Sequence, residues 1–242
     1  GDNDSEKEKE KNSNKRENVL EYARGGNFPE RRFIALGMLA NFFSNARKPS
    51  GTLGKIMIAG MNIFHAPVAR WGLSHLNIPD PSEIAELGCG GGKNIQALLK
   101  KYPDSHVTGL DYSPLSINKA RSHNKAMIAS GRCELVEGDV SAMTFSDGKF
   151  DLATAFETIY FWPGLAKCFA EVRRILKDGG HFLIVSESDG MDKPSLWFKQ
   201  YIDGMNTYTP PEIEAALRSA GFKDIITHHH PKHSWIVIIA EK

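Results

Sequence analysis

The sequence predicts an α/β protein whose sheet is largely parallel and covered by helices on both faces. From residue 83 onward, short apolar runs alternate with segments whose apolar residues recur at helical spacing. Most connecting segments are long enough to hold the crossover helices that parallel strands require. The last two predicted strands are joined by too few residues for a crossover, so we expect that pair to be antiparallel.

The first part of the chain has a different character. Residues 1–18 are rich in Lys, Glu and Asn, hold no apolar cluster, and are expected to form a disordered charged tail. Residues 19–82 show three helical stretches, the last beginning near Pro67, and we expect them to form a helical cap over the next domain. Five of its side chains could line a substrate pocket, although core packing is the commoner role for each: Tyr22, Phe28, Phe64, His65 and Trp71.

The elements of residues 83–242 are assigned from apolar runs bounded by turn residues and from helical periodicity. Strands are predicted at 84–88, 106–111, 133–137, 150–156, 180–186, 222–228 and 234–240. Helices are predicted at 94–101, 114–129, 165–176 and 212–220. Pro114 suits a first helical turn, and Gly221 suits the end of the last helix.

Composition excludes several classes of protein. The 242 residues carry 30 Lys and Arg against 29 Asp and Glu, so no overall basic charge indicates nucleic-acid binding. No run approaches the roughly 20 apolar residues of a membrane helix. Cys89, Cys133 and Cys168 are widely spaced, which suggests reduced thiols in a cytoplasmic setting.

The first strand runs into a glycine-rich turn that leads into a helix. Glu86, Gly88, Gly90 and Gly92 form the pattern E-x-G-x-G-x-G. Glycines let the backbone adopt positive φ and let a ligand approach closely. A dinucleotide fingerprint G-x-G-x-x-G would need glycine where Lys93 stands, and the phosphate-loop pattern is absent. The turn therefore predicts a ligand site of another kind, with a simple ligand-free turn as the alternative.

Two more acids follow the next strands. Asp111, at the end of the second strand, offers two acceptor oxygens to a ribose diol, or it caps the helix that begins at Pro114. Asp139 could accept a hydrogen bond from an adenine amino group while the Val140 N–H donates to the ring, or the segment is an ordinary acidic turn. With Glu86, these acids favour a nucleoside that carries positive charge.

Taken together, residues 83–242 resemble a class I S-adenosylmethionine-dependent methyltransferase. The resemblance rests on the glycine pattern, the acid after strand two, Gly-Asp-Val at 138–140, and Leu-Lys-Asp-Gly-Gly at 176–180. It implies a Rossmann-like seven-stranded sheet of order 3-2-1-4-5-7-6, and S-adenosylmethionine as methyl donor. It also implies these cofactor-binding residues: Glu86, Gly88, Cys89, Gly90, Asp111, Tyr112, Asp139, Val140 and Phe156.

The methyl acceptor is less clearly indicated. The segment after strand four lacks the N/D-P-P-Y/F pattern of many amine-methylating enzymes, and it is similar to UbiE-like bacterial enzymes that act on small molecules. We expect in-line displacement on an O, N, S or C atom, with Glu157, Tyr160 and His65 as weak catalytic candidates. Alternatives are a non-catalytic adenosylmethionine-binding regulator and a methyltransferase acting on RNA or protein.

Two other segments have weaker signals. The histidine-rich run 228–233 has no acidic or thiol partner at metal-binding spacing, so we expect a surface turn and no metal. The loop 186–211 carries apolar side chains that could form a pocket wall or simply pack: Trp197, Phe198, Tyr201, Met205 and Tyr208.

Overall fold

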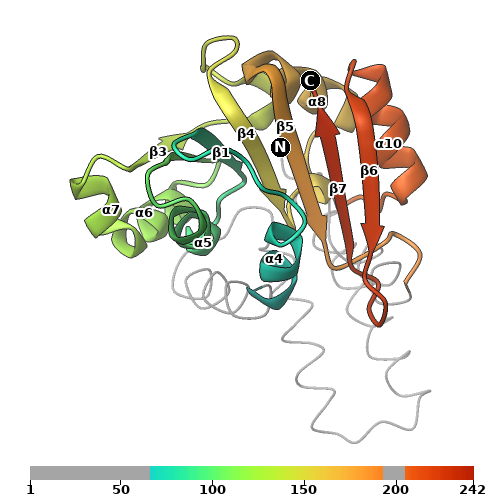
Figure 1. The fold of residues 1–242 in the computed structure, drawn as a ribbon, viewed down its shortest axis with the longest axis horizontal. Helices are drawn as coiled ribbons and strands as arrows, with labels where there is room; N and C mark the ends of the chain where they lie inside the picture. Colours follow the sequence, from blue (N-terminus) through green and yellow to red (C-terminus); the bar gives the residue numbers. More distant parts are fainter. Residues whose placement is uncertain (1–65, 193–204) are drawn as a thin grey trace, which may run out of the picture.

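The computed structural model describes residues 66–192 and 205–242 (Figure 1). The charged tail, the first two cap helices and part of the 186–211 loop lie outside the described residues, so the expectations placed on them stay predictions. Among the named candidates this applies to Tyr22, Phe28, Phe64, His65, Trp197, Phe198 and Tyr201.

The sheet has seven strands in the order β3-β2-β1-β4-β5-β7-β6, which confirms the predicted architecture. Strands β1 to β5 pair in parallel, while β7 runs antiparallel to both β5 and β6. The strands are β1 (Glu83–Leu87), β2 (His106–Asp111), β3 (Cys133–Glu137), β4 (Phe150–Phe156), β5 (Leu176–Ser186), β6 (Lys223–His229) and β7 (Ile236–Glu241).

Helices cover both faces of this sheet (Figure 1). They are α4 (Ala66–Leu73), α5 (Lys93–Lys101), α6 (Pro114–His123), α7 (Lys125–Ala129), α8 (Leu165–Ile175) and α10 (Pro210–Ser219), with short 3₁₀ helices η1 (Val140–Ala142) and η2 (Ile159–Phe161). None of the helices within the described ranges has the length and apolar character needed to cross a bilayer.

One predicted helix is wrong in detail. The expected single helix at 114–129 is divided into α6 and α7 at Asn124, whose backbone has φ −107° and ψ 21°. The buried Asn124 side chain donates hydrogen bonds to the carbonyl oxygens of Gly92 and Ala120, each at 3.0 Å. It therefore joins the end of α6 to the glycine turn. Helical periodicity carries no signal for a tertiary contact of this kind.

Alternating residues of the strands feed two separate cores. In β5, Phe182 and Ile184 lie in the core shared with α8 and α10. Leu183 and Val185 lie in the core shared with α4, α5 and α6. Helix α4 packs closely on β5 at Gly72, where the absence of a side chain leaves room for Val185. A Cβ atom at Gly72 would collide with the Val185 side chain.

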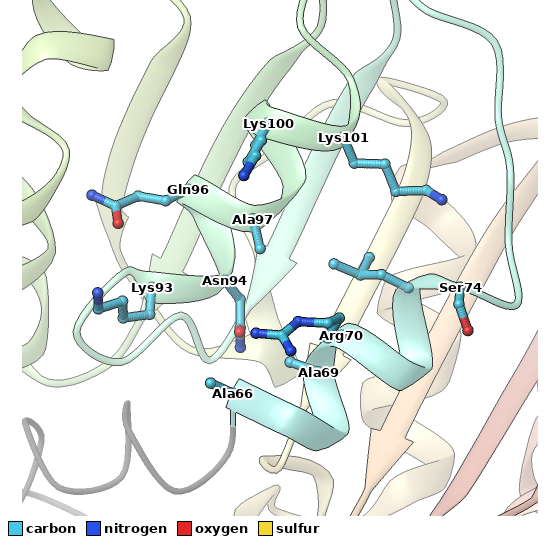
Figure 2. A pocket seen from close by; sticks show the side chains of 11 residues that line it. Ala66, Ala69, Arg70, Ser74, Lys93, Asn94, Gln96, Ala97, Lys100 and Lys101 are labelled. Carbon is cyan, nitrogen blue, oxygen red and sulfur yellow. The ribbon is translucent and has the colours of Figure 1, made fainter.

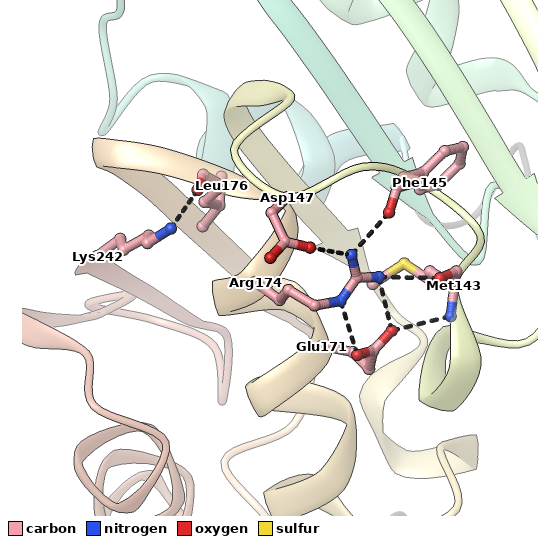
Figure 3. Close-up of polar contacts among 7 residues, drawn as sticks. All are labelled: Met143, Phe145, Asp147, Glu171, Arg174, Leu176 and Lys242. Atoms are coloured by element: carbon pink, nitrogen blue, oxygen red, sulfur yellow. Dashed lines mark hydrogen bonds and ion pairs between the residues drawn. The ribbon is translucent and has the colours of Figure 1, made fainter.

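An arginine network fixes the loop after β3 to α8 (Figure 3). Arg174 donates to the Glu171 and Asp147 carboxylates at 2.9 and 2.7 Å, and to the carbonyl oxygens of Met143 and Phe145 at 2.9 and 2.7 Å. Glu171 in turn accepts from the Met143 N–H at 3.0 Å. Its contact with Arg174 is the main reason that the pKa of Glu171 is lowered. The segment that carries Asp139 is thus anchored a few residues downstream.

Candidate functional site

The predicted site residues gather at the carboxyl ends of the parallel strands. The strand order changes direction between β1 and β4, since β2 and β3 continue on one side and β5 on the other. In open α/β sheets, ligands bind in the crevice outside the strands at such a switch point. The glycine turn follows β1 at this point, and Glu157 follows β4.

Three of the four glycines of the turn, Gly88, Gly90 and Gly92, have positive φ but differ in what surrounds them. Gly88 (φ 77°) lies against the Thr158 side chain, and a Cβ atom there would overlap Thr158 Oγ1. Gly92 (φ 77°) lies against Asn124, with its would-be Cβ 2.5 Å from Nδ2. Gly90 (φ 50°) has no atom within 4 Å of that position. Two glycines thus permit close packing, whereas Gly90 borders open space.

Asp111 ties the glycine turn to the end of β2. Its Oδ2 accepts from the Gly90 N–H at 2.8 Å, and its Oδ1 accepts from the Ser113 N–H at 2.9 Å. Burial raises the pKa of Asp111, and these two hydrogen bonds oppose that rise. The cap of α6 is Ser113, whose hydroxyl accepts from the Ser116 N–H at 3.3 Å. Each Asp111 oxygen still has a lone pair for a ligand.

Asp139 follows β3, next to the end of β2. The Gly138 N–H donates to the Asp111 carbonyl oxygen at 3.0 Å, which brings the ends of β2 and β3 together. The Asp139 side chain is exposed and accepts from the Ser141 N–H at 2.7 Å, so it caps η1. Val140 is buried. The carboxylate has a structural role in its turn and keeps Oδ2 available.

Glu86 is fully buried in β1. Its Oε2 accepts from the Thr154 hydroxyl, whereas its Oε1 has no hydrogen-bond donor among the residues that the structure describes. Burial raises the pKa of Glu86 to about 8, against the opposing effect of the Thr154 and Asn94 side chains nearby. The carboxyl is therefore mostly protonated at neutral pH. A buried acceptor without a donor is one that a cationic ligand group can satisfy.

Glu157 occupies an unusual position after β4. Its φ is 55°, a left-handed conformation that is strained for a residue with a side chain. Its Oε2 accepts from the Tyr160 hydroxyl at 3.3 Å, and its Oε1 accepts from the Glu187 N–H. Burial, followed by the nearby Glu187 charge, raises the pKa of Glu157 well above its ordinary value. Two of the three catalytic candidates are thus in contact, while His65 lies outside the described residues.

The remaining predicted cofactor residues have different surroundings. Tyr112 is 40% exposed next to Asp111, whereas Cys89 and Phe156 are buried. All three cysteines are free and buried. Sequence reasoning missed Thr158, Asn94 and Ser113, because each acts through a contact that only the fold creates.

Trp71 packs against the histidine run, and no ring contact ties it to the glycine turn among the described residues. Trp71 contacts the rings of His75, His230 and Trp235 with centroid separations of 4.7, 5.1 and 6.1 Å. His228 lies in β6, and His230 follows it in the connection to β7. Within residues 66–192 and 205–242, no group of three or more His, Cys, Asp or Glu is placed to hold a metal ion.

Comparison with known proteins finds methyltransferases that are similar to the region around the glycine turn. Residues 85–184 match the family model described as a methyltransferase domain. The chain is 28% identical over 178 residues to a sterol 24-C-methyltransferase of Neurospora crassa, covering 69% of this chain and 46% of that protein. It is 27% identical over 145 residues to a 2-methyl-6-phytyl-1,4-hydroquinone methyltransferase of Oryza sativa, covering 59% and 42%.

The fold also agrees with a solved structure. An S-adenosylmethionine-dependent methyltransferase from Mesorhizobium loti superposes with a TM-score of 0.62 at 18% identity, covering 74% of this chain and 100% of that one. The chain spans less than half the length of both curated relatives described above.

Proposed function

We propose that this chain transfers a methyl group from S-adenosylmethionine to a small-molecule acceptor, because residues 85–184 match a methyltransferase domain and surround a site that fits this cofactor. The main support for the proposal is the hydrogen bond that links Asp111, at the end of β2, to Gly90 in the glycine turn. The buried Asp111 carboxylate accepts a hydrogen bond from the Gly90 N–H at 2.8 Å, and its remaining lone pairs can accept from ribose hydroxyls. The space beside Gly90 allows a ligand to approach the backbone.

The residues of this edge fit the cofactor group by group. Asp111 would accept hydrogen bonds from both ribose hydroxyls, as a carboxylate with two oxygens can. Asp139 and the Val140 N–H would hold the adenine edge, with Tyr112 against its face. The backbone of Gly88 and Gly90 would approach the methionine portion. Glu86, whose Oε1 lacks a donor in the described part of the chain, would balance the ammonium group, either directly or through Asn94.

When bound, the cofactor supplies an electrophilic methyl group on a sulfonium. Because that donor is already activated, the protein contributes chiefly by aligning the acceptor for in-line displacement and by excluding water. Glu157 is poorly placed to act as a general base, because its Oε1 already accepts from the Glu187 N–H and its Oε2 from the Tyr160 hydroxyl. We assign Glu157 and Tyr160 to holding an acceptor hydroxyl or carbonyl through hydrogen bonds.

An apolar small molecule is the acceptor class that we favour. Both curated relatives are named for acceptors with large apolar portions, a sterol and a phytyl hydroquinone. Non-catalytic binding, and methylation of RNA or protein, are the alternatives.

Calorimetric titration of the full chain with S-adenosylhomocysteine tests the cofactor half. We expect binding, and we expect Asp111→Asn to weaken it strongly. Tight binding of NADH with no binding of S-adenosylhomocysteine would overturn the assignment. A transfer assay with methyl-labelled cofactor against small molecules, RNA and protein then separates the alternatives. Binding without turnover of any acceptor favours the regulatory protein.

A further inference from the structure

A basic cavity lies between α4 and α5 (Figure 2). Its volume is about 810 Å³, within the range typical of small-molecule sites. Of its eleven lining residues, four are basic, three are neutral and polar, four are apolar, and none is acidic. The basic ones are Arg70, Lys93, Lys100 and Lys101.

The four positive charges are a local feature of the fold. Over the whole chain basic and acidic residues nearly balance, 30 against 29. Among the described residues, no carboxylate pairs with any of these four cations, in contrast to Arg174, which contacts two. Lys101 donates to the Asn77 amide oxygen at 3.0 Å and lies over the Tyr102 ring, 5.5 Å from its centroid, so neither contact supplies a negative charge. Four like charges around one cavity repel each other, and a bound anion would relieve that repulsion.

The spacing of the cations limits the kind of anion. Lys93 and Lys100 are seven residues apart on α5, so they share one face of the helix about 10 Å apart along its axis. Figure 2 shows Arg70 extending from α4 toward the start of α5, whereas Lys100 and Lys101 lie near the C-terminal end of α5. A ligand with two or more phosphate groups contacts more of these cations at once than a single small anion does.

We propose that this cavity binds a small organic ligand that carries at least two phosphate groups. Ser74 and Gln96 add neutral hydrogen-bond donors, and the alanines of both helices leave room for a short carbon skeleton. The cavity begins at Lys93, directly after Gly92 of the glycine turn, so its ligand lies next to the cofactor edge. Binding of this ligand does not require methyl transfer.

Calorimetric titration of the full chain with inorganic pyrophosphate at low ionic strength tests the proposal. We expect wild-type binding that weakens with added salt. The double variant Arg70→Gln/Lys100→Gln should bind at least about tenfold more weakly, since it removes two charged hydrogen-bond donors to the anion. Both side chains are exposed, so the variant should fold, and circular dichroism checks this.

A matched control removes the same charges elsewhere. Arg121→Gln/Lys167→Gln changes one exposed arginine and one exposed lysine outside the cavity, and its affinity should stay within about twofold of wild type. Absent wild-type binding, or equal loss in both double variants, would overturn the proposal. So would binding to vesicles of anionic phospholipid without any binding of pyrophosphate. Affinity for S-adenosylhomocysteine should be unchanged in the cavity variant; if wild type itself fails to bind it, the proposed function fails independently.

Discussion

The two halves of the candidate site are built by different means. The half formed by the ends of β1, β2 and β3 is a backbone construction: glycines at positive φ, N–H groups held by Asp111, and a capped 3₁₀ turn. The half formed after β4 and β5 is a side-chain construction, in which Glu157 is buried at positive φ and contacts Tyr160 and Glu187.

This difference corresponds to what each half is proposed to bind. The proposed cofactor is the same molecule in every enzyme that uses it, so a site formed by the backbone can bind it. An acceptor differs between enzymes, so its half depends on side chains that can change without altering the strands. The predictions below test whether the halves are separable.

Loss of the Asp111 carboxylate should have the largest effect on the first half. Asp111→Asn removes an acceptor from the Gly90 N–H or the Ser113 N–H and from the ribose. We expect affinity for S-adenosylhomocysteine to fall about 100-fold or more, as two charged hydrogen bonds predict. Calorimetry measures this. Asp139→Asn, at an exposed position, serves as control and should lose less; an equal loss would contradict the special role of Asp111.

Gly90 can be compared with a glycine that has the same geometry and no ligand role. Gly90 and Gly131 both have positive φ and no atom within 4 Å of a would-be Cβ. Alanine at either position should cost about 1–2 kcal/mol of folding stability through strain. Only Gly90→Ala should also weaken S-adenosylhomocysteine binding, by about tenfold. Urea unfolding and calorimetry measure the two effects, and unchanged cofactor affinity in Gly90→Ala would show that this space is not used.

Glu157 tests the second half alone. Glu157→Gln keeps the hydrogen-bonding shape and removes the titratable proton, so cofactor affinity should stay within about twofold of wild type. Turnover should fall several-fold, with a rise in the acceptor KM. Glu157→Gly relieves the strained backbone and should be closer to wild type in stability than alanine at that position. A large loss of cofactor affinity in Glu157→Gln would show that the halves are not separable.

Glu86 should have the smallest effect on cofactor affinity, because its contribution depends on the fraction of the carboxyl that is ionised. Its pKa of about 8 in the folded protein lies above the 4.5 of an unperturbed glutamate. Between these values the folded state binds more protons than the unfolded state, so stability falls as pH rises from 4.5 to 8 and then levels off. A cationic ligand favours the ionised form, so binding at pH 7 should release part of a proton.

Calorimetry in buffers of different ionisation enthalpy detects this proton. Cofactor affinity should rise a few-fold as the pH increases from 6.5 to 8. Glu86→Gln should abolish both the proton release and the fall in stability over that window. Proton release that persists in this variant would assign it to another group.

The strands and the positions of the proposed cofactor residues after them could be read from local signals in the sequence, whereas the roles of those residues stay predictions. The strand order follows from the family resemblance, and β2, β3 and β4 begin and end at the predicted residues. Asp111 and the glycine pattern are read from their place after strands. Neither the break at Asn124 nor the contact of Thr158 with Gly88 has a local signal, because each joins segments distant in the chain.

The second half was only partly predictable for the same reason. Glu157 and Tyr160 could be named as candidates, but the positive φ and the burial that raises the pKa are products of packing. Glu187 comes from the next strand's end and has no motif of its own. The basic cavity forms only because the fold places α4 beside α5. Arg70 and Lys93 are distant in the sequence but line the same cavity.

The two backbone hydrogen bonds of Asp111 have a consequence for cofactor selectivity. A carboxylate pinned at both oxygens cannot rotate, so its free lone pairs point in fixed directions. A 2′-deoxy or 3′-deoxy analogue of the cofactor lacks one of the two hydroxyls, and the side chain cannot move to compensate for the lost hydrogen bond. Efforts to make this protein accept altered donors would therefore have to redesign the turn and the carboxylate together.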